Sequence, residues 1–189
     1  MRLAFPMIYR EIGISELDFG LFASFIRRQI VTDCWRRDGD VWVMKPDPFI
    51  DDWAYCDYRA LIGKLRRIKA SGGFVYGAFS EAGLKGFAAV DSRLFGSDMQ
   101  YMDLAELHVS SDMRRRGIGS VLFSAAVQFA SSRAARKLYI SAHSACETIS
   151  FYRAMGCTDA VWHDPEHVRK EPYDLQLEYD CNEKMLPRK

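Results

Sequence analysis

Residues 103–133 change from the pattern of an apolar strand to a basic turn with two glycines, and then to the pattern of a helix. The first part, DLAELHV, is rich in apolar residues, and from Ile118 onward apolar residues recur at helical spacing. The turn SSDMRRRGIG lies between them. It therefore comes at a helix N-terminus, where unpaired backbone N–H groups and the helix dipole favour an anion. This order predicts a phosphate-binding loop.

The residues of the turn suit a phosphate in two ways. Gly117 and Gly119 let a ligand approach the backbone closely, because a Cβ there would occupy the space of a phosphate oxygen. Arg114, Arg115 and Arg116 add charge and forked donors. The turn contains neither G-x-x-x-x-G-K-[ST] nor the third glycine of G-x-G-x-x-G. Taken alone, it is equally compatible with a solvated basic turn, because short motifs also match by chance.

Two elements together make the pattern more specific. Arg114-x-x-Gly117-x-Gly119, after a strand ending at Val109, resembles the acyl-CoA pyrophosphate loop [QR]-x-x-G-x-[GA] of the GNAT superfamily of N-acetyltransferases. Further along, FYRAMGC at residues 151–157 resembles the family element F-Y-x-x-x-G-F, with Cys157 in place of the last Phe. The resemblance covers residues 73–160 well and the first seventy residues poorly.

The resemblance implies an α/β fold with a central mixed, mostly antiparallel sheet of about six to seven strands, helices on both faces, and a splayed parallel strand pair that holds acyl-CoA. Residue patterns predict strands at 7–12, 74–79, 84–94, 103–109, 137–142, 159–162 and 173–179, and helices at 15–29, 51–69, from 118, and at 147–155. The strand at 137–142 should run parallel to that at 103–109, because a helix crosses between them. We expect residues 1–189 to form a single domain.

Two segments are predicted to be largely irregular. Within residues 32–58, Asp38-Gly39 favours a tight turn and residues 41–44 a short extended run that Pro46 and Pro48 end. Residues 163–172, which contain two prolines, are read as a loop.

Charge and composition exclude several classes of protein. The 26 basic and 25 acidic residues give a formal net charge of +1, so no global field favours nucleic acid or an anionic membrane. No run of about 18 apolar residues occurs, so neither a membrane span nor a signal peptide is expected. The five cysteines include no C-x-x-C pair, and the histidines have no metal-ligand spacing. We expect a cytoplasmic protein without a metal site.

For catalysis, the resemblance implies that Tyr152 protonates the departing CoA thiolate. A phenol can serve as such an acid. The alternative is an aromatic core residue beside Phe151.

The acceptor amine must also lose a proton, and the candidates for this general base are Glu106, Asp103 and His108. Strand alternation places Glu106 and His108 on one face and Asp103 on the other, unless the bulge common in the family is present. Glu106 is preferred, although an ordinary ion pair with a basic residue would explain it equally well.

The resemblance also implies contacts to acetyl-CoA as co-substrate. The splayed strand would offer the backbone of Leu107 and Val109 to the pantetheine arm, and the Val109 N–H would polarise the thioester carbonyl. Ser144 is a further candidate contact of this arm. The full set of expected cofactor contacts is Leu107, His108, Val109, Arg114, Arg115, Arg116, Gly117, Ile118, Gly119, Ser120, Ser144 and Tyr152.

The acceptor is expected to be an amine of a small molecule or a peptide. Family acceptor pockets are built from the segment between the first helices, which here is rich in aromatic and acidic residues that suit a cation. Trp35, Asp51, Asp52 and Trp53 are the candidates, and the alternative is that the aromatics form a small local core.

Three functions follow from these observations, and an N-acetyltransferase is preferred. The second is a non-catalytic CoA-binding or protein-interaction module on the same scaffold. A nucleic-acid binder that uses Arg114 to Arg116 ranks third, because the overall charge is near zero. A homodimer is compatible with the resemblance, since members of the superfamily are often dimers.

Overall fold

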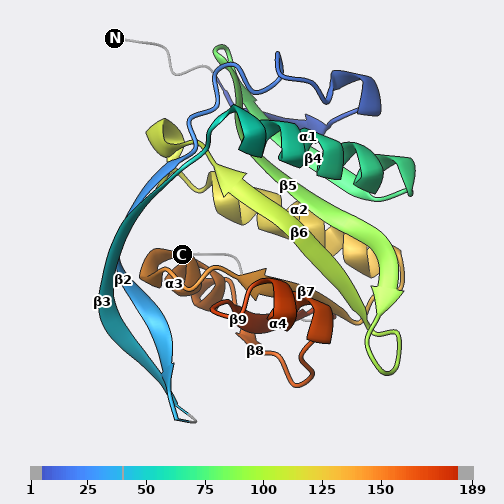
Figure 1. Cartoon of the computed structure of the whole chain (residues 1–189). Coiled ribbons are helices and arrows are strands. Elements are labelled where there is room, and N and C mark those ends of the chain that lie inside the picture. Colours follow the sequence, from blue (N-terminus) through green and yellow to red (C-terminus); the bar gives the residue numbers. More distant parts are fainter. Residues whose placement is uncertain (1–5, 40, 183–189) are drawn as a thin grey trace.

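The computed structural model describes residues 6–39 and 41–182. Within them, seven strands form one sheet in the order β1-β4-β5-β6-β7-β9-β8, and β2 and β3 form a second, two-stranded sheet (Figure 1). Among the strands of the described residues, only β6 and β7 pair in parallel. The strands of the large sheet are β1 (Ile8–Glu11), β4 (Phe74–Ser80), β5 (Gly83–Phe95), β6 (Tyr101–Val109), β7 (Lys137–Ala142), β8 (Thr158–Asp159) and β9 (Leu175–Asp180). The predicted mixed, mostly antiparallel sheet is confirmed.

Helices cover both faces of this sheet. Helix α1 (Tyr55–Ala70) packs on one face, and α2 (Ile118–Ser132) and α3 (Cys146–Ala154) pack on the other (Figure 1). The central strand β5 shows why two cores form. Phe87 and Ala89 join the core under α1, whereas Ala88 and Val90 join the core under α2, because successive side chains of a strand point to opposite faces.

Strands β6 and β7 separate soon after they begin. Their parallel register covers only Tyr101–Lys137 to Asp103–Tyr139. Strand β6 continues beyond this point with β5 as its partner, as far as the pair Val109–Gly86. Its other backbone edge therefore faces the space between the two diverging strands, which is the predicted splayed pair.

The register of β6 also contains a bulge. Ala89 pairs with Glu106 and the next residue, Val90, pairs with Leu104, so Ala105 is an extra residue on β6. A bulge of this kind shifts the side-chain alternation by one position. Without a bulge, Asp103 and Glu106 would point to opposite faces of β6. With this bulge between them, they can point to the same face.

The helix predicted over residues 15–29 is wrong. A short 3-10 helix, η1 (Ile14–Glu16), is followed by turns in which Phe22 N–H donates to Phe19 O (3.2 Å). The Asp18 carboxylate accepts the Leu21 N–H (3.0 Å), and Gly20 disfavours a helix, so local turns compete successfully. Phe22 is nevertheless buried. The apolar spacing of this segment therefore indicated correctly that residues such as Phe22 are buried, but the helix that it predicted does not form.

The irregular segment predicted over residues 32–58 is instead a long hairpin. Strands β2 (Arg28–Asp38) and β3 (Val41–Asp52) leave the main sheet and extend along one side of the molecule (Figure 1). The predicted turn at Asp38-Gly39 is correct, with a φ of 61° at Gly39. Pro46 and Pro48 do not end the strand. In a two-stranded sheet each strand has an open edge, where the missing proline N–H removes no ladder bond.

The helix expected over residues 51–69 begins later, at Tyr55. At the other end of the chain, the predicted loop contains helix α4 (Pro165–Lys170). The sequence at its start is typical of a helix N-terminus, because an N-cap residue is followed by a proline. The Asp164 carboxylate accepts the His167 N–H (3.1 Å), and Pro165 takes the first helical position. Strand β8 is shorter than the predicted 159–162. Among the helices described, none combines the length and the apolar character needed to cross a membrane.

Candidate active site

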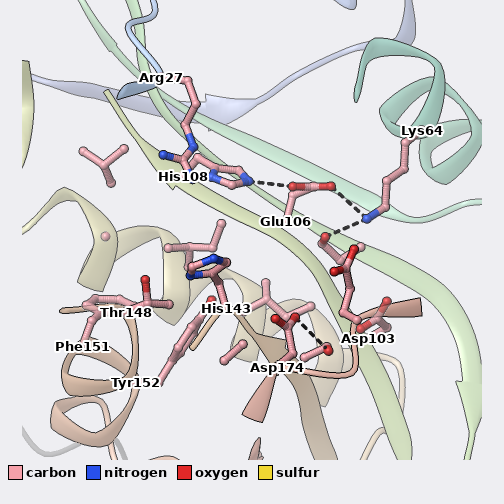
Figure 2. A pocket seen from close by; sticks show the side chains of 18 of the residues that line it. Arg27, Lys64, Asp103, Glu106, His108, His143, Thr148, Phe151, Tyr152 and Asp174 are labelled. Carbon is pink, nitrogen blue, oxygen red and sulfur yellow. Dashed lines mark hydrogen bonds and ion pairs between the residues drawn. The ribbon is translucent and has the colours of Figure 1, made fainter. Parts of the chain in front are cut away.

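The space between β6 and β7 opens into a cavity of about 1360 Å³ (Figure 2). Its walls come from segments far apart in the sequence. The residues that line it include Asp103, Glu106, His108 and Val109 of β6; Arg114, Arg115, Gly117 and Gly119 of the turn into α2; Ser141 and His143 in and after β7; Phe151 and Tyr152 of α3; Arg27, Asp51 and Trp53 at the base of the hairpin; Lys64 of α1; and Asp174 before β9.

The turn into α2 has the geometry of an anion cradle. Gly117 has a φ of 79°, and no atom lies within 4 Å of the position that a Cβ would take. The first turn of α2 leaves N–H groups without helical acceptors at this open point. A Cβ on Gly119 would lie 3.1 Å from Phe151 Cε2, so the second glycine also allows α3 to pack closely. Both glycines, Arg114 and Arg115 line the cavity, and Arg116 does not.

Glu106 is the centre of a hydrogen-bonded group on β6. Its Oε2 lies 2.7 Å from His108 Nε2, and its Oε1 accepts from Lys64 Nζ at 2.8 Å (Figure 2). Burial alone would raise the pKa of Glu106, but the bonds and charges of His108 and Lys64 outweigh it and lower the pKa to about 2. An ionised carboxylate held in this way is a weak proton acceptor.

His108 is the second base candidate that this group contains. With Nε2 directed at Glu106, Nδ1 is the ring nitrogen left for a substrate. Trp53 and Phe87 hold the ring, with centroid distances of 4.8 and 5.3 Å. The arrangement resembles other sites in which a carboxylate orients a catalytic imidazole.

The bulge brings a second carboxylate to the same cavity. Asp103 lines it together with Glu106, and its Oδ2 lies 3.4 Å from His167 Nε2 on α4. Since this histidine is a partner of Asp103, the carboxylate ties α4 to β6.

Tyr152 lies on α3 and points into the cavity from the side opposite Glu106 (Figure 2). It is 7% exposed, packs against Phe123 and Phe151, and its hydroxyl makes no hydrogen bond within the described part of the chain. Burial raises the pKa of Tyr152 far above its usual range. The phenol therefore keeps its proton at every physiological pH and has it available for a ligand.

Asp174 and His143 are among the titratable residues of the cavity that the sequence did not predict. Asp174 accepts a hydrogen bond from Ser141 Oγ (3.1 Å), and burial raises its pKa to about 6. His143 accepts the Ala145 N–H on Nδ1 (3.1 Å), and burial lowers its pKa. No local motif marks either residue, because only the packing of β7 and β9 brings them to the cavity.

The sequence profile of the acetyltransferase (GNAT) family matches residues 29–157, which is more than half of the chain. The chain belongs to the GNAT acetyltransferase family. It is therefore an acyltransferase, and acetyl-CoA is its co-substrate. No curated protein matches this GNAT chain by sequence.

Solved structures share the fold of this GNAT protein at low sequence identity. A nourseothricin acetyltransferase is 16% identical with a TM-score of 0.65, over 93% of this chain and 98% of the other. A Bacillus anthracis protein named as a streptothricin acetyltransferase, solved with acetyl coenzyme A, is 14% identical with a TM-score of 0.64, over 92% and 96%. The ribosomal-protein-S18-alanine N-acetyltransferase of Escherichia coli is 10% identical with a TM-score of 0.56, over 95% and 96%. Their named substrates differ widely, so the fold leaves the acceptor open.

Several residues expected in this GNAT site lie elsewhere. Ser144 is 2% exposed and does not line the cavity; its hydroxyl is bonded to Arg36 Nη1 and its carbonyl accepts the Trp35 N–H at 2.8 Å. It attaches the hairpin to the body of the protein. Trp35 and Asp52 are also outside the cavity, and Asp52 faces Arg28 (3.7 Å). Of the four acceptor candidates, only Asp51 and Trp53 line the cavity.

Proposed function

We propose that this GNAT protein moves the acetyl group of acetyl-CoA to a primary amine of a small molecule or a peptide by direct attack. The observation that carries the proposal is one cavity that joins the cradle at Gly117, the open edge of β6, the Glu106–His108 pair and the Tyr152 hydroxyl. These are the parts that a direct transfer needs: an anion site, a channel for an amide chain, a base and an acid.

In this proposal the pyrophosphate lies at the start of α2, against the N–H groups of Gly117 to Gly119 and the side chains of Arg114 and Arg115. The pantetheine arm lies along the unpaired edge of β6, where Leu107 and Val109 offer backbone groups. The backbone N–H of Val109 is our candidate for polarising the thioester carbonyl.

The chemical step needs one proton to leave the amine and one to reach the thiolate. We assign the first to His108 Nδ1, with Glu106 as the residue that orients the ring, in place of Glu106 itself. The amine nitrogen attacks the carbonyl carbon, the tetrahedral intermediate loses the thiolate, and Tyr152 gives the thiolate its proton. The tyrosine regains a proton from the imidazolium or from water, so no covalent intermediate on the protein is required.

The strength with which Glu106 is held also supports a second candidate, a CoA-binding module without acetyl transfer. Lys64 and His108 both form hydrogen bonds with the Glu106 carboxylate, which is therefore not free to act as a base. Such a module would bind acetyl-CoA and acetylate no amine.

Calorimetric titration with acetyl-CoA tests the cradle, with Gly117→Glu as the variant and Gly72→Glu as its control. Both glycines have a positive φ, 79° and 85°, and both have open space at the Cβ position, but only Gly117 lines the cavity. The strain of the substitution is therefore matched, and only Gly117→Glu places a carboxylate where the pyrophosphate would lie. We expect binding by the wild type and by Gly72→Glu and loss of at least about tenfold in Gly117→Glu.

A screen of primary amines, with thiol release as the readout, then separates the two candidate functions. Turnover of at least one amine supports acetyl transfer, whereas tight acetyl-CoA binding without turnover favours the binding module. Absence of acetyl-CoA binding by the folded wild type would contradict both.

A further inference from the structure

Arg27 enters the cavity from the base of the hairpin, directly before β2 (Figure 2). Its side chain is only 10% exposed and its guanidinium lies over the Trp53 ring, 5.2 Å from the centroid. Nη2 forms an ion pair with Asp51. The other two nitrogens, Nε and Nη1, are buried and have no hydrogen-bond partner among the described residues.

A buried guanidinium with unused donors is unusual. Nε and Nη1 carry three N–H bonds, and buried donors in proteins are almost always paired, because an unpaired one loses its bonds to water without replacement. The other buried side-chain atom without a partner in the described chain, Trp35 Nε1, lies outside the cavity. Arg27 differs from Trp35 because it lines the cavity, so a ligand in the cavity could pair with its free donors.

The surroundings favour an anionic oxygen as the partner. Asp51 offsets one positive charge, but Arg114 lies close enough that burial and the charge of Arg27 together lower its pKa. His143 is also near, and the same Arg27 charge helps to lower the pKa of that imidazole. A neutral carbonyl would satisfy the donors, whereas an oxyanion would form the stronger, charge-assisted hydrogen bonds that a guanidinium makes with carboxylates and phosphates.

We propose that Arg27 is an oxyanion-binding residue of the cavity, and that its ligand is a carboxylate on the acceptor amine. The identity of this ligand rests on the proposed acetyl transfer. A phosphate of CoA has the same chemistry, and the test below separates the two sources. The hairpin is the favoured side for an acceptor because the phosphate cradle already has Arg114 and Arg115.

The test observes Arg27 directly in the wild-type protein. The arginine Nε–H signals are recorded by ¹⁵N–¹H NMR, and the signal of Arg27 is identified by its loss in Arg27→Lys. CoA is added first, and acetate, as a bare carboxylate, is then added to the CoA-saturated protein with sodium chloride as the salt control. Arg28 is the matched residue: it is the next residue in the chain, pairs with Asp52 at 3.7 Å and does not line the cavity.

We expect acetate to shift the Arg27 signal saturably and to leave the Arg28 signal in place. Calorimetry of Arg27→Lys and Arg28→Lys then assigns the source. An unchanged CoA affinity in Arg27→Lys assigns the site to the acceptor, and a loss of tenfold or more in Arg27→Lys alone assigns it to a CoA phosphate. If neither acetate nor CoA moves the Arg27 signal, or Arg27→Lys changes no affinity for either, the oxyanion site is disproved.

Acetylation rates of two amines that differ only in a carboxylate test whether the oxyanion site affects turnover. We expect L-lysine to be acetylated at least tenfold more efficiently than 1,5-diaminopentane by the wild type and by Arg28→Lys, with the preference reduced in Arg27→Lys. If no amine is acetylated while acetate still shifts Arg27, the proposed acetyl transfer fails and the oxyanion site stands. Equal use of both amines by the wild type, with acetate binding absent, leaves the transfer intact and removes the site.

Discussion

His108 carries the base in our proposal, so its replacement should affect chemistry and not cofactor binding. We expect His108→Gln to lower kcat by about 10²-fold, a common loss for a missing general base, with an unchanged Kd for acetyl-CoA. Glu106→Gln should cause a smaller loss, because the imidazole remains but its orientation weakens. Steady-state kinetics with calorimetry measures both effects. A greater loss in Glu106→Gln than in His108→Gln would return the base to Glu106.

Tyr152 should behave in the same way on the acid side. The Tyr152→Phe variant keeps the ring that packs against Phe123 and Phe151 and removes only the hydroxyl. We expect kcat to fall by about 10- to 10²-fold while stability and acetyl-CoA affinity are retained. Kinetics with thermal unfolding tests this, and Tyr101→Phe, which removes a buried hydroxyl bonded to Glu178 outside the cavity, is a control for loss of a buried phenol. An unaltered kcat would exclude Tyr152 as the acid.

At the scale of elements, helix α4 is attached to the sheet through His167 and through its N-cap residue Asp164, whose N–H donates to Tyr139 of β7 (2.9 Å). The helix has no buried residue, and His167 links it to Asp103 of β6 (3.4 Å) and to Asp164 (2.7 Å). The hydrogen bond that His167 Nε2–H donates to Asp103 is the largest effect on His167 and, with the bond to Asp164, raises its pKa to about 9, against the opposing effect of burial. Because α4 borders the cavity, its attachment should matter for the acceptor side of the site.

The raised pKa gives this attachment a definite pH dependence. The protonated imidazole is favoured in the folded state, so the stabilisation is complete below the unfolded pKa of about 6.5 and is lost as the pH rises through about 9. Allowing for partial exposure, its size is roughly 1–2 kcal/mol. Amide hydrogen exchange of residues 166–171, corrected for intrinsic rates, should rise over this range in the wild type and in Arg169→Gln. The His167→Gln variant should exchange fast throughout; a flat wild-type profile would contradict the prediction.

At the scale of the molecule, we propose that the chain folds as one domain. In the order of the chain, the first strand, β1, pairs with β4, and the last strand, β9, lies between β7 and β8 in the same sheet, so both belong to one hydrogen-bonded structure. We expect a single urea transition that coincides for tryptophan fluorescence and far-ultraviolet circular dichroism. Two separated transitions would indicate that the hairpin or another unit unfolds independently.

The sequence was a good guide where structure is decided over a few residues. The turn at Gly117, helix α2 and the C-terminal glycine of α3 follow from glycine, charge and helical spacing, all of which act locally. The sequence was misleading where a local pattern is compatible with more than one backbone structure. Residues 15–29 are apolar at helical intervals but form turns, and β3 passes through two prolines because its edge is open.

The sequence by itself determined the family, the mixed sheet and the glycine turn at the start of α2, because these depend on short motifs and on the order of elements. Only the tertiary structure decided which partners the residues of the candidate site have. Glu106 acquires its partner Lys64 from 42 residues away, and Arg27 receives Asp51 from the opposite strand of the hairpin. Ionisation and hydrogen bonding depend on such neighbours in space and on burial, which residue order does not specify.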